Sequence, residues 1–400
     1  MLTSFKTKLN LNNHQRTLAA KHAGTARHAW NWGLALALEI LGRNEWLPSA
    51  IDLHKKLVAE VKSVHSWYYE VSKCAPQQAL RNLYRAFQDY FKMPSRGNPK
   101  FKKKNVKDSF YLEGSIKVSG NRIKLPHFGW VKACEILPSV QPKNVTVTKI
   151  AEDWYVSFRY EIDVKPTPKV RDRIGVDVGI SSLATCSDGS VFPNVKAYRQ
   201  AKRKLAHLQR AASRCQKGSK NRSKANLRVA RLHRRISDIR KDKLNKLTTW
   251  LAKNHGEILV EDLNVSGMLK NHRLASAIAD CGFYEFKRQL TYKAERYGSQ
   301  ITLVDRFYPS SQLCSCCGHR QKMPLKERVF KCGNCQKELD RDLNASINIE
   351  RWHPQIDYPK TASSAEIACG GSKKPGSSST RDSVKQEPSV KPTYIQLSLF

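Results

Sequence analysis

Acidic side chains and long apolar runs are both scarce in this chain. It contains 34 Asp and Glu residues against 71 Lys and Arg residues, which gives a formal net charge of +37 over 400 residues. A positive surplus of that size repels itself unless a polyanion neutralises it, and nucleic acid is the usual polyanion. Composition therefore favours a nucleic-acid-binding protein over a basic protein that has no such partner.

No apolar stretch is long enough to cross a membrane. The longest helical stretch, residues 29–41, is interrupted by Asn31 and Glu39, whereas a span needs about 20 apolar residues. Residues 1–11 alternate polar and apolar side chains and do not read as a signal peptide. We therefore expect no membrane partner and a reducing cytoplasm, in which the 11 cysteines bind metal or stay as free thiols.

Periodicity predicts a small β-barrel in the first part of the chain. Strands are expected at 4–11, 116–118, 122–125, 145–147 and 154–160, and a helical insert separates the first strand from the others. Asn12 and Asn13 are suited to cap the first helix of the insert. Another helix opens at Pro76, and the stripe formed by Leu80, Leu83, Tyr84, Phe87, Tyr90 and Phe91 predicts its buried face.

The second part of the chain predicts a mixed α/β domain. Buried strands at 174–180, 257–263 and 300–304 alternate with helices, among them a Lys- and Arg-rich hairpin at 199–251. Residues 165–168 are a predicted boundary between the two parts. From residue 363 the chain consists largely of Ser, Gly, Pro and Lys, so we expect it to be disordered.

Paired cysteines predict a structural zinc site. The sequences C-S-C-C-G (314–318) and K-C-G-N-C (331–335) contain two C-x-x-C knuckles separated by a short basic loop. Four thiolates at this spacing are typical of zinc ribbons. Cys316 adds a third cysteine to the first knuckle and offers an alternative register there.

Three carboxylates predict a second metal site. Asp177 lies inside an apolar strand, Glu261 ends another, and Asp342 precedes the start of a helix. Each alone is more often a surface residue or a helix cap, and Asp340 in particular is suited to cap that helix. If the three converge, they make an all-oxygen site for two Mg²⁺ ions, which is the chemistry of metal-dependent phosphodiester cleavage. Asp262, next to Glu261, is expected on the opposite strand face.

These residues belong to longer motifs by which the chain resembles the TnpB family of insertion-sequence proteins, relatives of the type V CRISPR nucleases. The motifs are G-V-D-V-G-I (175–180), V-E-D-L (260–263), S-S-Q-L-C-S-C-C-G (310–318), C-G-N-C (332–335) and R-D-L-N-A-S-I-N-I (341–349). Similar segments occur at 26–34, at 123–132 and in the tail at 368–388. The resemblance covers nearly the whole chain.

The resemblance implies an RNA-guided DNA endonuclease. Its guide RNA would come from the right end of the transposon, and its target would be double-stranded DNA beside a short motif. The catalytic acids of the family match Asp177, Glu261 and Asp342, which would also hold two Mg²⁺ or Mn²⁺ ions. The ligands of one structural Zn²⁺ match Cys314, Cys317, Cys332 and Cys335, which leaves Cys316 as a spare thiol. A monomeric ribonucleoprotein in the prokaryotic cytoplasm, associated with the nucleoid, is expected.

The resemblance also implies a domain organisation in an α/β fold. We expect a wedge-like β-barrel domain at 1–20 and 105–168 that carries a helical recognition insert at 21–104. A RuvC, ribonuclease H-like, nuclease domain is expected at 169–305 and 339–352, with an inserted zinc ribbon at 306–338. A disordered basic tail would occupy 353–400.

Candidate nucleic-acid contacts follow from charge and from the family pattern. Lys73 and Gln77 match positions that contact target-adjacent DNA in the family, and Gln and Lys side chains are able to read base edges. Lys102, Lys103 and Lys104 belong to a basic loop that is suited to a nucleic-acid backbone, although a run of charge is often only a solvated surface. The strand region at 112–115 departs from the family pattern.

Three other functions remain open from the sequence. A catalytically silent RNA-guided repressor or transposition accessory protein would have lost one of the three acids, and none is lost here. A zinc-ribbon DNA-binding protein would need no guide RNA. A strand-transferring transposase would use the same kind of acidic site but would join DNA ends instead of releasing them.

Overall fold

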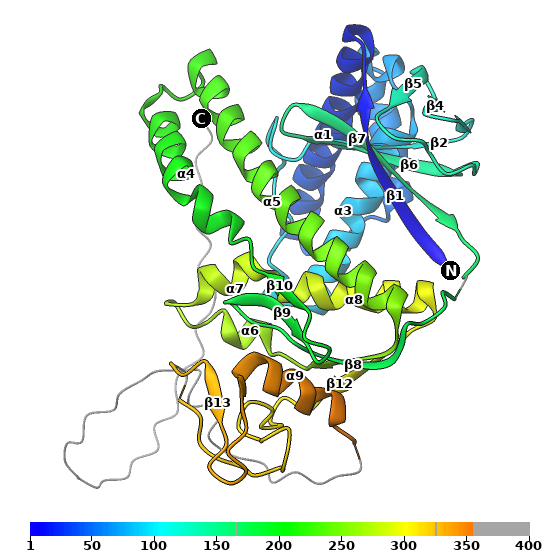
Figure 1. Ribbon diagram of the computed structural model, residues 1–400. Helices are drawn as coiled ribbons and strands as arrows, with labels where there is room; N and C mark the ends of the chain where they lie inside the picture. Colours follow the sequence, from blue (N-terminus) through cyan, green and yellow to red (C-terminus); the bar gives the residue numbers. More distant parts are fainter. Residues whose placement is uncertain (165, 325, 355–400) are drawn as a thin grey trace, which may run out of the picture.

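Two large β-sheets, each packed against its own helices, and one small two-stranded sheet make up the computed structural model (Figure 1). The structure describes residues 1–164, 166–324 and 326–354. The expectation of a disordered tail from residue 363 lies outside the described residues, as does nearly all of the tail segment 353–400. No helix in the described ranges is long and apolar enough to cross a membrane.

The N-terminal unit contains a seven-stranded antiparallel sheet with the order β2-β6-β7-β1-β5-β4-β3. Its strands are β1 (Leu2–Asn10), β2 (Ser109–Glu113), β3 (Lys117–Ser119), β4 (Arg122–Leu125), β5 (Gly129–Ala133), β6 (Asn144–Ile150) and β7 (Asp153–Glu161). The expected pairing of the first strand with later strands is therefore confirmed, whereas closure into a barrel stays a prediction. The N-terminal unit denotes this sheet together with the helices between β1 and β2.

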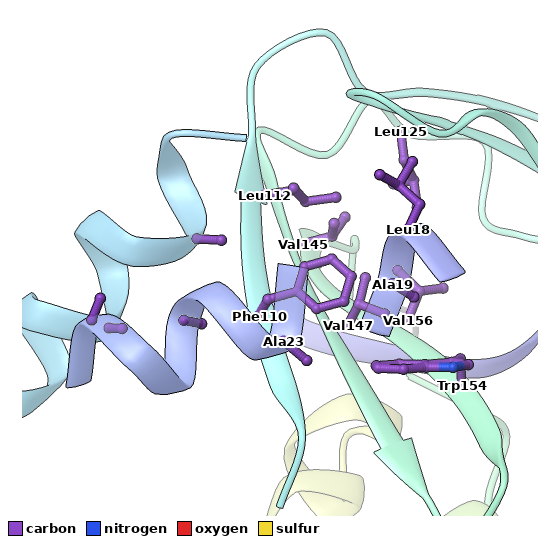
Figure 2. Packing of buried hydrophobic residues seen from close by; sticks show 14 of the residues in the cluster. Leu18, Ala19, Ala23, Phe110, Leu112, Leu125, Val145, Val147, Trp154 and Val156 are labelled. Atoms are coloured by element: carbon purple, nitrogen blue, oxygen red, sulfur yellow. The ribbon is translucent and has the colours of Figure 1, made fainter. Parts of the chain in front are cut away.

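Six helical segments form the expected insert between β1 and β2. They are α1 (Asn13–Gly42), α2 (Ala50–Lys56), the π-helical turn η1 (Leu57–Lys62), the 3₁₀ turns η2 (Ser66–Glu70) and η3 (Pro94–Arg96), and α3 (Cys74–Lys92). Asn12 caps α1 as predicted, and Asn12 and Gln15 form a reciprocal capping box. Figure 2 shows Ala19 and Ala23 of α1 beside Phe110, Val145 and Trp154 of the sheet.

The buried stripe of α3 is shorter than predicted. Leu80, Leu83 and Phe87 are buried against α1, where Gly33 lets the two helices approach closely. Phe91, one turn later, is 52% exposed, and the prediction that it is buried was wrong. Phe91 lies in the last turn of α3, which ends at Lys92, and the buried residues of this helix end at Phe87.

The C-terminal unit is built on a five-stranded mixed sheet with the order β10-β9-β8-β11-β12. Its strands are β8 (Arg171–Asp177), β9 (Ser182–Cys186), β10 (Val191–Pro193), β11 (His255–Glu261) and β12 (Gln300–Val304), and β8, β11 and β12 are parallel. Its helices are α4 (Ala197–Arg214), α5 (Lys220–Asn254), α6 (Val265–Met268), α7 (Ala275–Cys281), α8 (Phe283–Tyr297) and α9 (Arg341–Arg351). The mixed α/β class and the basic helical hairpin are confirmed.

Helices cover both faces of this sheet. Ile174, Val176 and Ile258 face a core that contains residues of α5 and α8, whereas Leu259 packs with Ile349 of α9. In Figure 1, α5 and α8 lie on one side of β8 and α9 on the other. Alternate residues of each strand point to opposite faces, so the strand sequence decides which residues face α9.

A small two-stranded hairpin precedes α9. Strand β13 (Val329–Lys331) pairs with β14 (Glu338–Asp340), and α9 begins at the next residue. Residues 306–340, which contain this hairpin, are called the ribbon. Phe330 is buried among the cysteines Cys314 and Cys332.

Ion pairs join the two units. Arg231 of α5 pairs with Glu152, and Arg234 of α5 pairs with Asp153 at 2.5 Å. Asp153 also pairs with Lys8 at 3.1 Å. The C-terminal end of helix α5 therefore packs in the C-terminal unit, and the middle of the same helix contacts the N-terminal unit.

We predict that Gly175→Ala unfolds at a lower temperature than the parent protein. A Cβ atom at residue 175 would overlap Ser346 O and the backbone of Glu350, and two backbones cannot move apart without lifting α9 off the sheet. The expected loss of unfolding free energy is about 3 kcal/mol, near the upper end for overpacking. Thermal denaturation followed by circular dichroism measures it. Gly42→Ala is the control, because a Cβ atom there meets nothing within 4 Å; equal stability of the two variants would contradict the prediction.

Candidate active site and metal centre

Two of the three predicted acids end neighbouring parallel strands. Asp177 is the last residue of β8 and Glu261 the last of β11, and the register pairs Gly175 with Leu259 two residues earlier. Gly175 and Leu259 face α9, so Asp177 and Glu261 leave the same sheet face side by side. The strand pattern thus delivers two carboxylates to one point at the edge of the sheet.

Helix α9 brings the third acid. Asp342 lies in its first turn, and Asp340 is the N-cap residue, whose side chain accepts hydrogen bonds from the backbone N–H groups of Asp342 and Leu343. Asp340 is therefore engaged as a helix cap. Asp177, Glu261 and Asp342 all line one cavity of about 860 Å³.

Asp262 lies on the other side of the strand, as predicted. Its carboxylate pairs with Lys287 of α8 at 2.8 Å and with Arg306 at 2.5 Å. Hydrogen bonds from these two cations hold the pKa of Asp262 below its usual range. Asp262 is therefore a surface ion-pair residue, although it adjoins Glu261 in sequence.

The acidic cluster is electrostatically strained. Desolvation, followed by repulsion from Glu261 and Asp342, raises the pKa of Asp177 well above its usual range. Burial also raises the pKa of Glu261, and the hydrogen bond from Ser310 partly offsets that effect. Carboxylates forced together in this way are stabilised by a bound cation.

Cations line the same cavity as the acids. Basic side chains contribute to it from α4 and the residue before it, from the segment before α7, from the ribbon and from the start of α9: Lys196, Arg199, Lys202, Arg273, Arg328 and Arg341. Arg328 Nη1 lies 4.0 Å from Asp342 Oδ1. A cavity lined by both acids and cations suits a metal-bound phosphate, because the cations neutralise the oxygens that the metals do not reach.

The ribbon is attached to the acidic site by buried hydrogen bonds. Ser310 Oγ donates to Glu261 Oε1 at 2.7 Å. Asn348 Nδ2 of α9 donates to the carbonyl oxygens of Ser310 and Leu313, and Asn344 Nδ2 also donates to the Leu313 carbonyl. The ribbon therefore positions Glu261 directly and Asp342 through α9.

The four predicted zinc ligands form one cluster. Among the residues that the structure describes, Cys314, Cys317, Cys332 and Cys335 are the one group of His, Cys, Asp or Glu side chains whose ligand atoms all lie within 4.8 Å of one another. The Cys314–Cys335 and Cys317–Cys332 Sγ distances are both 3.6 Å, close to the roughly 3.8 Å expected between sulfurs of a tetrahedral zinc site. Cys316 lies outside the cluster, which agrees with its prediction as a spare thiol.

The two candidate metal centres differ in their donors. Four sulfurs suit one Zn²⁺ ion, and no further position is left open for chemistry. Three carboxylates supply oxygen ligands, which suit Mg²⁺ or Mn²⁺.

The predicted nucleic-acid residues divide into two groups. Lys73 at the start of α3 is exposed and Gln77 is half-buried, and Lys103 and Lys104 are exposed. Lys102 is different, because its Nζ lies 3.6 Å from the centre of the Trp30 ring and Asn31 hydrogen-bonds both its N–H and its C=O. Burial lowers the pKa of Lys102 to about 8. This lysine anchors the basic loop to α1.

Sequence reasoning missed several residues that shape the site. Ser310 stands in the S-S-Q-L motif, so the motif was a signal, but its contact with Glu261 was not foreseen. Asp280 of α7 was missed altogether. Its buried carboxylate accepts hydrogen bonds from the N–H groups of Tyr198 and Arg199, and so fixes the start of α4 beside the acids.

Comparison with known families links both units to one group of proteins. The OrfB_IS605 family, described as a probable transposase, matches residues 157–272. A Cas12f1-like TNB domain matches residues 283–349, and a helix-turn-helix domain matches residues 1–45. The TNB match contains the four cysteines and Asp342.

Curated relatives match most of the chain. A putative RNA-guided DNA endonuclease of Streptomyces pristinaespiralis is 38% identical over 330 residues, which cover 80% of this chain and 79% of that protein. The putative RNA-guided DNA endonuclease InsQ of Escherichia coli K12 is 34% identical over 393 residues, 92% of this chain and 94% of that protein. TnpB-like protein L770 of Acanthamoeba polyphaga mimivirus is 26% identical over 287 residues, 61% of this chain and 55% of that protein.

The chain belongs to the TnpB family. The matched regions show where the motifs of the TnpB family lie in this structure. The helix-turn-helix match covers strand β1 and the single 30-residue helix α1, so these residues do not form two helices around a turn. The resemblance inferred from the sequence motifs is confirmed, together with the relation to type V nucleases.

We predict that Asp177→Asn stabilises the metal-free TnpB-family chain at neutral pH. The folded-state pKa of Asp177 is raised, so the folded parent binds more protons than the unfolded chain between about pH 4 and that raised pKa, and its stability falls as pH rises through this window. The amide removes the charge and flattens that dependence. Thermal unfolding in a chelator at pH 5 and 7.5 measures both effects.

Asp262→Asn is the matched control for this measurement. The pKa of Asp262 is lowered by its two cation partners, so its charge stabilises the fold above the usual carboxyl pKa. We expect a small loss of stability at pH 7.5 in Asp262→Asn, opposite in sign to the gain in Asp177→Asn. The same sign in both variants would contradict the electrostatic assignment.

We predict that the parent protein binds one zinc ion per chain and that Cys332→Ser loses it. Removing one of four thiolates opens the cluster around buried Phe330. Metal analysis of the purified protein measures the zinc content. Cys316→Ser is the control because Cys316 lies outside the cluster; loss of zinc in that variant alone would reverse the ligand assignment.

Proposed function

We propose that this protein is an RNA-guided endonuclease that cleaves double-stranded DNA by metal-dependent phosphodiester hydrolysis. The observation that carries the proposal is the convergence of Asp177, Glu261 and Asp342 in one cavity that cations also line. Two relatives that are 34–38% identical over most of their length are named putative RNA-guided DNA endonucleases, which supports the same activity here.

The three carboxylates would hold two Mg²⁺ or Mn²⁺ ions. Bound there, such a pair supplies a deprotonated water and stabilises the leaving oxygen. The protein's own share is positional, since Ser310 orients Glu261 and the cap at Asp340 fixes the first turn that carries Asp342. Arg199, Lys202 and Arg328 would hold the phosphates on either side of the bond to be cut.

The proposal includes the domain organisation expected from the sequence. The C-terminal unit would be a RuvC-like nuclease domain at 169–305 and 339–352, with the zinc ribbon at 306–338 inserted before α9. The N-terminal unit would be a wedge-like β-barrel at 1–20 and 105–168 with its recognition insert at 21–104. A four-cysteine cluster at the ribbon and the basic α4–α5 hairpin support this division of labour.

Guide and target would bind between these parts. A guide heteroduplex is held through its phosphates, so it needs exposed cations and few base-specific groups. Lys202, Arg203 and Lys204 on α4 are exposed and follow directly from the cavity wall. Lys73, Gln77, Lys103 and Lys104 in the N-terminal unit would contact nucleic acid as well, with Lys102 holding their loop in place.

We predict that the complex with its guide RNA cuts a motif-bearing DNA duplex in Mg²⁺ and that Asp177→Ala reduces the rate at least about 1,000-fold. The reason is that loss of one carboxylate removes shared metal ligation. Gel analysis of end-labelled strands gives the rate, and filter binding checks that target affinity is unchanged. Asp262→Ala is the control, because Asp262 lies on the opposite strand face and should cut nearly normally.

Product analysis separates the alternatives. Discrete guide RNA with target binding but no cleavage by the parent protein would identify a silent repressor. Joined DNA products would identify strand transfer, which the probable-transposase description of the family keeps open. Cleavage that survives Asp177→Ala would overturn the assignment of the acids.

A further inference from the structure

A second cavity lies in the N-terminal unit, outside the acidic site. It has a volume of about 710 Å³ and lies between α1 and η2. Cavities of roughly 300–1,000 Å³ are the usual size of ligand pockets. We call it the α1 pocket, and six of its lining residues carry the argument: Lys21, Gly24, Arg27, His28, Trp32 and Trp67.

Aromatic rings dominate one side of the α1 pocket. Trp67 is half-buried and stacks on buried Tyr68 with ring centres 4.4 Å apart and 29° between planes. His28 meets Trp67 edge-on at 5.2 Å, and its Nδ1 lies 2.8 Å from the Tyr68 hydroxyl oxygen. Trp67 is therefore held in a fixed orientation while part of its surface stays open to the pocket. Trp32, also half-buried, packs against the core beside it.

The protonation states of His28 and Tyr68 suit a neutral planar ligand. Burial, and secondarily His65, lowers the pKa of His28, so the imidazole is neutral at pH 7. A neutral imidazole offers one donor and one acceptor nitrogen. With one nitrogen facing Tyr68, the other is able to hydrogen-bond a ligand. Tyr68 stays protonated because burial raises its pKa.

Gly24 gives an independent sign that the pocket is kept open. It lies in the middle of α1, where glycine is a poor helix former. Its conformation does not require glycine, and a Cβ atom there would meet only Arg27 Nη2 at an ordinary 3.8 Å. Gly33 in the same helix is different, because a Cβ atom there would collide with Leu80. Packing explains Gly33, whereas at Gly24 the missing side chain leaves space in the pocket.

The free positive charge beside the α1 pocket comes from the basic loop at its edge. Lys21 and Arg27 lie at the wall, but Glu70 and Asp108 pair with them and offset their charge. Asn31, which also lines the pocket, holds the backbone of Lys102, so exposed Lys103 and Lys104 follow directly from its edge. A chain with a net charge of +37 repels cationic partners.

We propose that the α1 pocket binds one unstacked nucleobase of a nucleic-acid strand, with Trp67 and Trp32 as the stacking surfaces. The strand's phosphates lie along the exposed Lys103 and Lys104. Aromatic stacking of single bases beside a basic track is a general mode of binding to unpaired strands. The inference concerns binding and does not depend on the nuclease activity proposed above.

Photo-cross-linking of the full-length chain tests this inference directly. The probes are 12-nucleotide single strands that carry 5-iodouracil at one position, one made of DNA and one of RNA. We expect peptides that contain Trp32, Trp67 or His28 to carry the adduct, and the DNA and RNA arms show which strand the pocket prefers. Adducts of both probes confined to peptides outside the α1 pocket would overturn the proposal.

Oligonucleotide affinity gives a second test of the α1-pocket proposal, with two variants and two matched controls. Gly24→Leu fills the cavity without loss of helix propensity, and Trp67→Ala removes a stacking surface. We expect each to weaken oligonucleotide binding roughly 5- to 100-fold, the range for loss of one stacked base, in fluorescence anisotropy. Gly24→Ala should bind like the parent. Trp46→Ala should also bind like the parent, because Trp46 is 95% exposed and lies outside the pocket.

The controls make either result decisive. Parent-like affinity in Gly24→Leu, with folding verified by thermal denaturation, would overturn the proposal. An equal loss in Trp46→Ala would also overturn it, because stacking would then not be specific to the α1 pocket. All variants also carry Asp177→Ala. The binding measurement therefore does not require DNA cleavage, and its outcome is independent of the proposed nuclease activity.

Discussion

Helix α9 lies on the sheet of the C-terminal unit only because residue 175 has no side chain. The backbone of α9 at Ser346 and Glu350 occupies the space where a Cβ atom would be. That close approach sets the distance between the first turn of α9 and the ends of β8 and β11, where Asp177 and Glu261 lie. Asn344 and Asn348 then tie the same helix to the ribbon. The register of β8 and β11 fixes Asp177 beside Glu261, and this backbone contact places Asp342 and the ribbon relative to them.

The chemistry of the site depends on a cluster of acids within a strongly basic chain. The chain as a whole is strongly basic, yet three carboxylates are crowded at one point, where Glu261 and Asp342 help to raise the pKa of Asp177. Cations from α4, the ribbon and α9 line the same cavity, and Arg328 lies 4.0 Å from Asp342. Asp262 differs, since two cations lie within 2.8 Å of it and neutralise it.

Local patterns were enough to predict many of the strands, the cap at Asn12 and the strand end at Glu261, because each depends on residues within a few positions. Strands β2 and β5 were not predicted, and Asp177, expected inside a strand, is the last residue of β8. The cysteine pairing was equally local. Contacts between distant segments were not predictable in the same way. Ser310 reaches Glu261, and Asp280 reaches the start of α4, only after the sheet and its helices have packed. The position of Lys102 was not foreseen for the same reason, since a basic run in the sequence does not reveal that one of its members lies over the Trp30 ring.

The three acids come from well-separated parts of the chain, and the last of them lies beyond the ribbon. Asp177 and Glu261 are synthesised long before Asp342, and Glu261 lacks its Ser310 partner until the ribbon has begun to emerge. Folding of the sheet alone leaves two carboxylates without the third. The acidic cluster is thus completed only after the ribbon has been synthesised, so a chain that stops before residue 342 carries the basic helices but lacks the third acid.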